Sequence, residues 1–322
     1  MSSIPLMKIY IIGATKEFNK RIQKALEASG QKDVVTIIVS KITPKELAEK
    51  AGDAEMLVAS PSGFEMVSRE HINNLPKLKF ITTTSVGTDW IDVEAAKERG
   101  IVVCNQKGVN AEAVAEHCFG MILDLSKRIT EADRDIREKG ECRSSLYMGI
   151  ELYGKTLGII GLGDIGQRVA RIAKGFSMKV LGVNKSKKQV NGIEVVSSET
   201  LLKESDVIAV TIPLTRDTED LLSEKEFNFM KLGVILVSIS RESIINKQAV
   251  LNALDSEKIG GYGFDADIMT RIKKGDPYFK YQRIVITPHS ASMTKEADKG
   301  YVDMTVENIS AFINENPIRV VG

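Results

Sequence analysis

The stretch from Lys155 to Asn184, KTLGIIGLGDIGQRVARIAKGFSMKVLGVN, constrains the fold of this chain more than any other part of the sequence. It opens with a short apolar run and continues with Gly161, Gly163 and Gly166 in the spacing G-x-G-x-x-G. Apolar residues then recur at helical spacing, and a second apolar run follows. The stretch therefore predicts a strand, a glycine turn, a helix and a second strand.

Glycines in this setting have mechanical roles. One permits the tight turn, one lets a pyrophosphate approach the backbone, and one lets the helix pack closely against the strand. The start of the helix also presents backbone N–H groups to phosphate. Because the spacing alone also occurs in ordinary turns, the flanking strands and helix carry the prediction. We expect a dinucleotide site here, with a purely structural glycine turn as the alternative.

Length and composition narrow the class of protein. A chain of 322 residues is long enough for two domains. Lys and Arg number 44 against 43 Asp and Glu, so the charge gives no field that attracts nucleic acid or an anionic membrane. Three scattered cysteines suit neither a disulfide framework nor a metal site, and neither a signal peptide nor a membrane-spanning run is present. We therefore expect a cytoplasmic protein with no metal, nucleic-acid partner or membrane association.

Short apolar runs alternate with helical patterns along the chain, which indicates parallel sheets. Besides the runs of the glycine stretch, the expected strands are 7–13, 34–39, 56–59, 80–83, 101–104, 207–212, 234–240, 260–266 and 285–287. Residues 110–139 form one long helical pattern, and a last helix over 294–314 is expected to return to the first domain. The predicted domains are 1–104 plus 291–322, and an inserted nucleotide-binding domain at 105–290.

Six motifs follow one another in a diagnostic order. They are SVGTDWID at 85–92, GVNAEAVAEH at 108–117, GLGDIG at 161–166, PLTRDTEDLL at 213–222, SISRESIINKQAVLNAL at 238–254 and TPHSAS at 287–292. From about Phe80 onward the chain resembles the D-isomer-specific 2-hydroxyacid dehydrogenases, which include phosphoglycerate, glyoxylate/hydroxypyruvate and D-lactate enzymes. The resemblance implies two doubly wound parallel α/β domains, a flavodoxin-like substrate domain and a Rossmann cofactor domain. It also implies a homodimer built through the segment from Asn110 to Tyr153.

The resemblance implies an NAD(P)-dependent oxidoreductase that transfers hydride between the nicotinamide and a small 2-oxo or 2-hydroxy acid. Arg241 and His289 would be the chemical pair. The guanidinium of Arg241 is suited to hold a carboxylate and polarise the carbonyl, since it offers a planar fork of N–H donors. The imidazole of His289 is suited to protonate the carbonyl oxygen, because an imidazole titrates in the pH range that serves both directions of the reaction. His71 and His117 are expected to be structural.

Further contacts follow from the same resemblance. Substrate would be bound by Ser62, Gly63, Val86 and Gly87 together with Arg241. Asp265 would contact the nicotinamide carboxamide. The remaining cofactor contacts implied are Gly161, Gly163, Asp164, Ile165, Gly166, Asn184, Lys185, Ser186, Lys187, Pro213, Thr218, Ile239, Ser240 and His289.

Two departures from the family pattern matter. Asn184 stands where many members carry an acidic residue that binds the adenine ribose, and Lys185, Ser186 and Lys187 follow it. A carboxylate about 4 Å from a 2′-phosphate opposes it by roughly 4 kcal/mol per unit charge at an effective dielectric of 20. We therefore predict that NADP is preferred over NAD.

The second departure is Thr270, which an ungapped alignment places where the family has a glutamate that supports the catalytic histidine. A hydroxyl can hold an imidazole but brings no charge, so we expect His289 to be protonated less readily than in relatives. The same departure keeps open an alternative function. The chain would then be a cofactor-sensing, weakly active or non-catalytic regulatory protein on this fold. The sequence does not name the 2-oxo acid.

Overall fold

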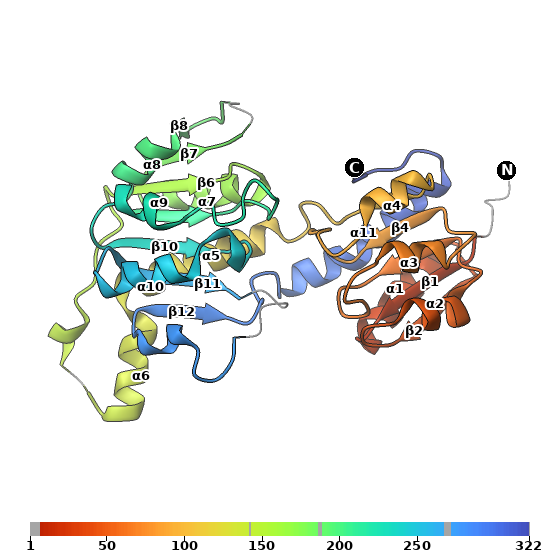
Figure 1. Cartoon of the computed structure of the whole chain (residues 1–322), viewed down its shortest axis with the longest axis horizontal. Coiled ribbons are helices and arrows are strands. Elements are labelled where there is room, and N and C mark those ends of the chain that lie inside the picture. The colour runs from red at the N-terminus through yellow and green to blue at the C-terminus, as the bar shows by residue number, and fades with distance from the viewer. Residues whose placement is uncertain (1–6, 142, 186–188, 267–271, 322) are drawn as a thin grey trace. The chain divides into compact units, whose positions relative to one another are not determined.

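The computed structural model of the chain describes residues 7–141, 143–185, 189–266 and 272–321 (Figure 1). The chain divides into two compact units, one formed by 1–110 with 294–322 and the other by 111–293. These boundaries compare with 104/105 and 290/291 expected from the sequence. Each unit contains its own all-parallel sheet.

The first unit has a five-stranded sheet in the order β2-β1-β3-β4-β5. Its strands are β1 Ile9–Gly13, β2 Val34–Ile38, β3 Met56–Ala59, β4 Phe80–Thr83 and β5 Val102–Cys104. The strands read as continuous apolar runs because alternate residues are buried on opposite faces. Ile9 and Ile11 enter one apolar cluster, whereas Tyr10 and Ile12 enter the other. The strand order is that of flavodoxin-like folds, which confirms the predicted fold class.

Helices cover both faces of this sheet (Figure 1). One face carries α1 Lys16–Ala28 and α11 Lys295–Ile313, and the other carries α2 Pro44–Ala51, α3 Arg69–Asn73 and α4 Val93–Glu98. Helix α11 is the last long helix of the chain, yet it packs on strands from the first hundred residues. The C-terminal segment therefore contributes to the core of the first unit.

The second unit has a seven-stranded sheet in the order β12-β11-β10-β9-β6-β7-β8. Its strands are β6 Thr156–Ile160, β7 Lys179–Val183, β8 Glu194–Val195, β9 Val207–Val210, β10 Val234–Ser238, β11 Ile259–Asp265 and β12 Ile284–Thr287. The chain winds outward from β6 to one side and then from β9 to the other. This is the doubly wound order of the Rossmann fold, again as predicted from the sequence.

One face of the second sheet is covered by α5 Ala111–Lys127 and α7 Asp164–Gly175. The other is covered by α8 Ser198–Glu204, α9 Glu224–Phe229 and α10 Lys247–Asp255. A further helix, α6 Ile129–Lys139, lies beyond the end of α5 and projects from the sheet at the lower left of Figure 1.

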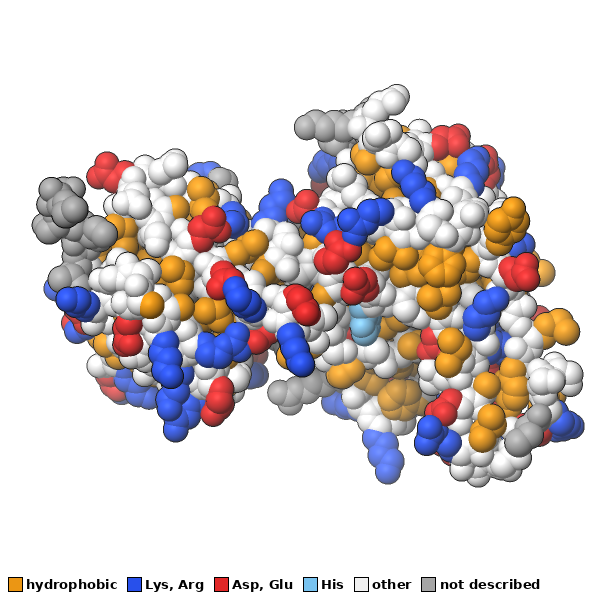
Figure 2. Space-filling model, turned by 180° about the vertical axis from the view of Figure 1, so that it is seen from behind, with side chains coloured by type: hydrophobic (Ala, Val, Ile, Leu, Met, Phe, Trp, Pro, Cys, Tyr) orange, Lys and Arg blue, Asp and Glu red, His pale blue; other side chains and the backbone are white. Residues whose placement is uncertain are grey.

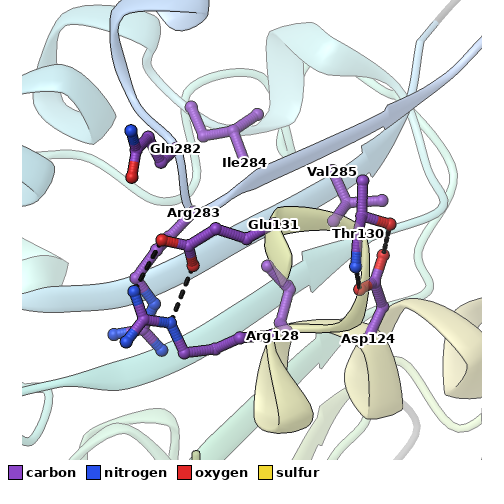
Figure 3. A pocket seen from close by; sticks show the side chains of 9 residues that line it. Asp124, Arg128, Thr130, Glu131, Gln282, Arg283, Ile284 and Val285 are labelled. Atoms are coloured by element: carbon purple, nitrogen blue, oxygen red, sulfur yellow. Dashed lines mark hydrogen bonds and ion pairs between the residues drawn. The ribbon is translucent and has the colours of Figure 1, made fainter. Parts of the chain in front are cut away.

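The single long helix expected over 110–139 is wrong, because the chain breaks between α5 and α6 at Arg128. This residue has a left-handed backbone with φ of 57°. The Asp124 carboxylate accepts from both the backbone N–H and the hydroxyl of Thr130, which gives α6 a new start (Figure 3). The Arg128 guanidinium donates from Nε and Nη2 to Glu131 at 2.7 and 2.6 Å. Apolar periodicity continues through such a break, so the sequence pattern does not reveal it.

Asn308 joins α11 to the rest of the first unit. Its Nδ2 donates to Thr82 Oγ1 at 3.1 Å and to the Asn105 carbonyl oxygen at 3.0 Å, while its Oδ1 accepts from Arg319 Nη1 at 2.9 Å. The side chain is 0% exposed. Its amide therefore satisfies polar groups that water does not reach.

We predict that Asn308→Ala lowers the stability of the protein by about 2–3 kcal/mol, because it leaves buried partners unpaired. Thermal unfolding followed by circular dichroism measures this as a fall in Tm of several degrees. Asn316→Ala, at an exposed position after the same helix, is the control and leaves Tm in place. Equal Tm values for the two variants would contradict the role assigned to Asn308.

Candidate functional site

The carboxyl ends of the second sheet bring the residues singled out by the sequence to one edge. The ladder aligns Val183, Ile160, Val210 and Ser238 across neighbouring strands. The residues that end or follow the strands at this edge are Gly161, Asn184, Thr211–Pro213, Ile239–Arg241, Asp265 and Pro288–His289. In open α/β sheets, ligands bind outside this edge where the strand order reverses, which here is between β6 and β9.

The glycine turn after β6 has the form that a dinucleotide requires. Gly161 has φ of +104°, and a Cβ on Gly166 would lie 2.0 Å from the Gly161 carbonyl oxygen. Gly163 is the N-cap of α7 and makes no side-chain cap, so the first N–H groups of the helix face outward. A Cβ on Gly163 would meet nothing within 4 Å. The turn therefore offers open space and free donors to a pyrophosphate.

Thr211, at the end of β9, fixes this turn. Its Oγ1 donates to the Gly161 carbonyl oxygen at 2.6 Å, across the point where the strand order reverses. Asp164 and Ile165 occupy the first turn of α7. The Thr211 side chain thus has a structural partner in the glycine turn.

Other predicted cofactor residues shape the loops in which they lie. Thr218 Oγ1 donates to the Pro213 carbonyl oxygen at 2.9 Å and accepts from the Thr215 N–H at 2.7 Å. Ser240 Oγ donates to the Val210 carbonyl oxygen at 3.1 Å, and Ile239 N–H donates to the same carbonyl at 3.3 Å. These bonds set the form of the turns after β9 and β10.

The end of β7 carries the residues expected to select the cofactor. Asn184 is half-buried at the strand end. Lys185 Nζ lies 3.2 Å from Asp217 Oδ2, with both side chains largely exposed. An ion pair so exposed to water adds little stability, so the Lys185 ammonium is readily redirected to another anion. Ser186 and Lys187 lie outside the described residues.

Arg241 and His289 follow β10 and β12, the two strands that flank β11. Both side chains are half-buried. His289 has a left-handed backbone with φ of 56°. Its Nδ1 is buried and has no hydrogen-bond partner among the described residues. Thr270, the candidate partner of this histidine, lies outside the described part of the chain.

Asp265 ends β11 and is 9% exposed. Its Oδ1 accepts from Thr287 Oγ1 at 2.5 Å and from the Ser290 N–H at 2.9 Å, and its Oδ2 accepts from the Ala291 N–H at 2.9 Å. His117 Nε2 lies 2.9 Å from the same Thr287 Oγ1. The sequence assigned Asp265 to the cofactor and treated His117 as structural, and it gave no signal that these residues share one hydrogen-bonded chain.

In the first unit, Ser62 and Gly63 follow β3 and lie against the end of β1. Ser62 Oγ accepts from the Ala14 N–H at 3.0 Å. A Cβ on Gly63 would lie 2.8 Å from the Gly13 Cα, so the close approach of these two backbones requires glycine. Both residues thus have roles in the packing of the loop itself.

Val86 and Gly87 lie in the loop after β4. Their carbonyl oxygens are held, since Asn105 Nδ2 donates to the Val86 oxygen at 2.9 Å and Trp90 Nε1 to the Gly87 oxygen at 3.0 Å. Within the described chain, no group accepts a hydrogen bond from the backbone N–H of either residue. Two adjacent backbone donors of this kind suit an anionic ligand such as a carboxylate.

Two hollows lie away from these edges. One is lined by Asp124, Arg128, Glu131 and Arg283 beside the start of β12 (Figure 3), and the other by Gly233, Ile259 and Gly260 near the amino ends of β10 and β11. Neither includes a residue that the sequence singled out. Since ligands of open α/β sheets bind at the opposite edge, we do not place the site there.

The described residues include no cluster of three His, Cys, Asp or Glu side chains placed to hold a metal ion. None of their helices is long and apolar enough to cross a membrane. Burial raises the pKa of the Cys104 thiol to about 11 and that of Cys118 to about 12, so neither acts as a thiolate nucleophile near neutral pH.

Comparison with known proteins agrees with this geometry. Residues 119–291 match the family model of the D-isomer specific 2-hydroxyacid dehydrogenase, NAD binding domain. A glyoxylate reductase from Thermococcus litoralis is 38% identical over 83% of this chain and 82% of its own length. The match to the family model covers the second unit from the middle of α5 to the loop after His289.

Two solved structures extend the likeness to nearly the whole chain. An acyclic imino acid reductase in complex with NADPH and D-Arg has a TM-score of 0.88 and 30% identity, and covers 98% of this chain and 100% of its own. A glyoxylate reductase from Paecilomyes thermophila has a TM-score of 0.87 and 27% identity, with 98% of each chain covered. The chain belongs to the D-isomer specific 2-hydroxyacid dehydrogenase family, whose members are NAD(P)-dependent oxidoreductases.

Proposed function

We propose that this protein reduces a small 2-oxo acid of the glyoxylate type, with NADPH as the preferred hydride donor, and that Arg241 and His289 carry the chemistry. The observation that carries the proposal is that both residues follow strands at the carboxyl edge of one sheet, the same edge that carries the glycine turn. The glyoxylate reductases among its relatives support the substrate class.

In this proposal the Arg241 guanidinium holds the substrate carboxylate and polarises the adjacent carbonyl. Its half-buried position favours this, because a guanidinium shielded from water binds an anion more strongly than an exposed one. The imidazole of His289 delivers a proton to the carbonyl oxygen as the alcohol forms. In the first unit, we propose Val86, Gly87, Ser62 and Gly63 as substrate-binding residues, supported by the two adjacent backbone N–H groups of Val86 and Gly87 that suit a carboxylate.

The nicotinamide cofactor, when bound, supplies the hydride. Gly161, Gly163 and Gly166 make room for its pyrophosphate, and the first N–H groups of α7 bind it. The loops that contain Pro213, Thr218, Ile239 and Ser240 lie along the same edge and line the path of the cofactor. These residues bind and orient, while Arg241 and His289 act on the substrate.

We predict that His289→Ala lowers kcat for glyoxylate by about 10²- to 10⁴-fold, as expected for loss of a general acid. Arg241→Ala raises KM and lowers kcat together, because the carboxylate and the polarised carbonyl lose the same donor. Steady-state NADPH oxidation with glyoxylate, hydroxypyruvate, pyruvate and phosphohydroxypyruvate measures both effects.

Arg171→Ala, which removes an exposed arginine from the second half of α7, is the control for loss of positive charge and retains activity. Tight NADPH binding without turnover of any of these acids would instead favour a cofactor-sensing protein, and would contradict the proposed reductase.

The preference for NADPH is proposed from the end of β7. Asn184 is neutral where an acidic residue would repel a 2′-phosphate, and the exposed Lys185 ammonium lies beside it. We predict that Asn184→Asp shifts the ratio of kcat/KM for NADPH over NADH toward NADH by about 10- to 100-fold, since it places a like charge close to the phosphate.

Asn191→Asp adds the same charge at an exposed position of the following loop and serves as the control. Its cofactor ratio stays near that of the wild type. A wild-type enzyme with equal efficiency for both cofactors, or one that prefers NADH, would refute the proposed selectivity.

We also propose a homodimer, formed through α6 and the segment that follows it. Apolar side chains are unusually exposed there, with Met148 at 80%, Tyr153 at 76%, Ile129 at 56% and Ile136 at 52%. Figure 2 shows apolar side chains gathered on the surface of the second unit, at the right of that view. Exposed apolar side chains that gather on the surface of a folded protein support an interface there.

We predict that the combined variant Ile136→Glu and Met148→Glu is monomeric, whereas the wild type is dimeric by light scattering. Leu232→Glu is the control, since Leu232 is 76% exposed but belongs to the loop before β10 and not to α6 or the segment that follows it. A monomeric wild type would rule out the proposed dimer.

A further inference from the structure

We infer that Asp265, Thr287 and His117 are positioning residues that hold His289 in its active orientation. The inference deepens the proposed function, on which it rests for the role of His289. It assigns Asp265 a task other than the cofactor contact expected from the sequence, and it gives His117 a task where the sequence indicated none. The three residues come from β11, β12 and α5 of the second unit.

The backbone of His289 needs external support. Its φ of 56° lies in the left-handed region, which is unfavourable for a residue other than glycine. Such a conformation persists only where the surrounding structure fixes it. The Pro288 turn, closed by the His289 N–H to the Thr287 carbonyl oxygen at 3.1 Å, fixes one side of the residue.

The Asp265 carboxylate holds the backbone on both sides of His289. Before His289 it receives the Thr287 hydroxyl at 2.5 Å, and after it the N–H groups of Ser290 and Ala291, each at 2.9 Å. Asp265 and Thr287 are also register partners in the β11–β12 ladder. Hydrogen bonds to an ionised acceptor are stronger than neutral ones. These three donors, which we call the Asp265 clamp, therefore close the loop around His289.

The direction of the hydrogen bonds identifies the tautomer of His117. An ionised carboxylate only accepts, so the single hydroxyl proton of Thr287 points to Asp265. The oxygen of Thr287 is then an acceptor toward His117, 2.9 Å away. His117 Nε2 must carry a proton. The clamp thus continues as a chain of donors from α5 through Thr287 to Asp265.

In this series of hydrogen bonds, the His117 N–H orients the Thr287 hydroxyl by donating to its oxygen. Without the His117 N–H, the Thr287 hydroxyl is free to rotate and to turn its proton toward another acceptor. Three of the roughly four acceptor positions of the Asp265 carboxylate are occupied by the clamp. Its main task is therefore within the protein, although one position is left for a cofactor donor.

Substitution of Thr287 separates the positioning of His289 from a cofactor contact of Asp265, because it removes a clamp donor while Asp265 stays in place. We predict that Thr287→Val, which keeps the shape but loses the hydroxyl, lowers kcat by about 10- to 100-fold through misplacement of His289. KM for glyoxylate and Kd for NADPH, measured by fluorescence titration, stay within about twofold because the binding groups are untouched.

Thr287→Ser keeps the hydroxyl and is the matched control, with kcat within about threefold of the wild type. His117→Leu follows the direction of Thr287→Val, and His117→Gln, which offers an N–H donor, restores most of the loss. An unchanged kcat in Thr287→Val, or an equal loss in the Ser and Val variants, would overturn the inference.

A readout independent of turnover is available because the chain has three histidines. In protein labelled with ¹⁵N-histidine, NMR resolves the ring nitrogens of each and reports the tautomer of His117. We expect a protonated Nε2 on His117, and His289 ring signals that are sharp in the wild type and Thr287→Ser but broadened in Thr287→Val. A His117 protonated only at Nδ1, or identical His289 signals in all three proteins, would refute the clamp.

The proposed reductase activity and the Asp265 clamp can be refuted separately. If His289→Ala loses turnover while Thr287→Val retains it, the reductase stands and the clamp is wrong. If the wild type turns over no 2-oxo acid but the NMR signals respond as expected, the clamp stands as a structural device and the proposed reaction is wrong.

Discussion

Parallel strand pairing, with both faces of each sheet covered by helices, is the constraint on which the rest of this structure depends. A crossover connection, helical in most cases here, returns the chain across the sheet between strands, so every strand points the same way and every carboxyl end lies at one edge. Alternate residues of each strand enter opposite apolar clusters, as Ile159 and Ile160 of β6 do. The glycine turn, Arg241 and His289 thereby all follow strands at this one edge.

The same constraint explains how residues far apart in the chain meet. Gly161 and Thr211 follow neighbouring strands, and the Thr211 hydroxyl fixes the carbonyl of the glycine turn. Asp265 and Thr287 are opposite each other in the ladder, so a carboxylate from one strand end holds the loop of the next. In an NAD(P)-dependent 2-hydroxyacid dehydrogenase, this arrangement ties the turn that faces the pyrophosphate and the loop of the proposed acid to one rigid sheet.

Most of the fold was predictable because its signals are local. The apolar runs of the strands and the spacing of Gly161, Gly163 and Gly166 follow from burial and backbone geometry over a few residues. The break between α5 and α6 was not predictable. It depends on the Arg128 backbone and on the Asp124 carboxylate, and neither alters the apolar periodicity that the sequence displays. The candidate site divides in the same way, since the motifs name Arg241 and His289 but not the partners that orient them.

The sequence by itself determined that the chain forms two parallel α/β units with a dinucleotide turn, because these features depend on residue type and spacing. It also determined the family, through motifs that lie at successive strand ends. Only the tertiary structure decided that Asp265 receives three donors and that His117 stands behind Thr287. The physical reason is that the direction of a hydrogen bond depends on where side chains from separate elements meet, and local patterns of residue type and spacing do not reveal which residues meet.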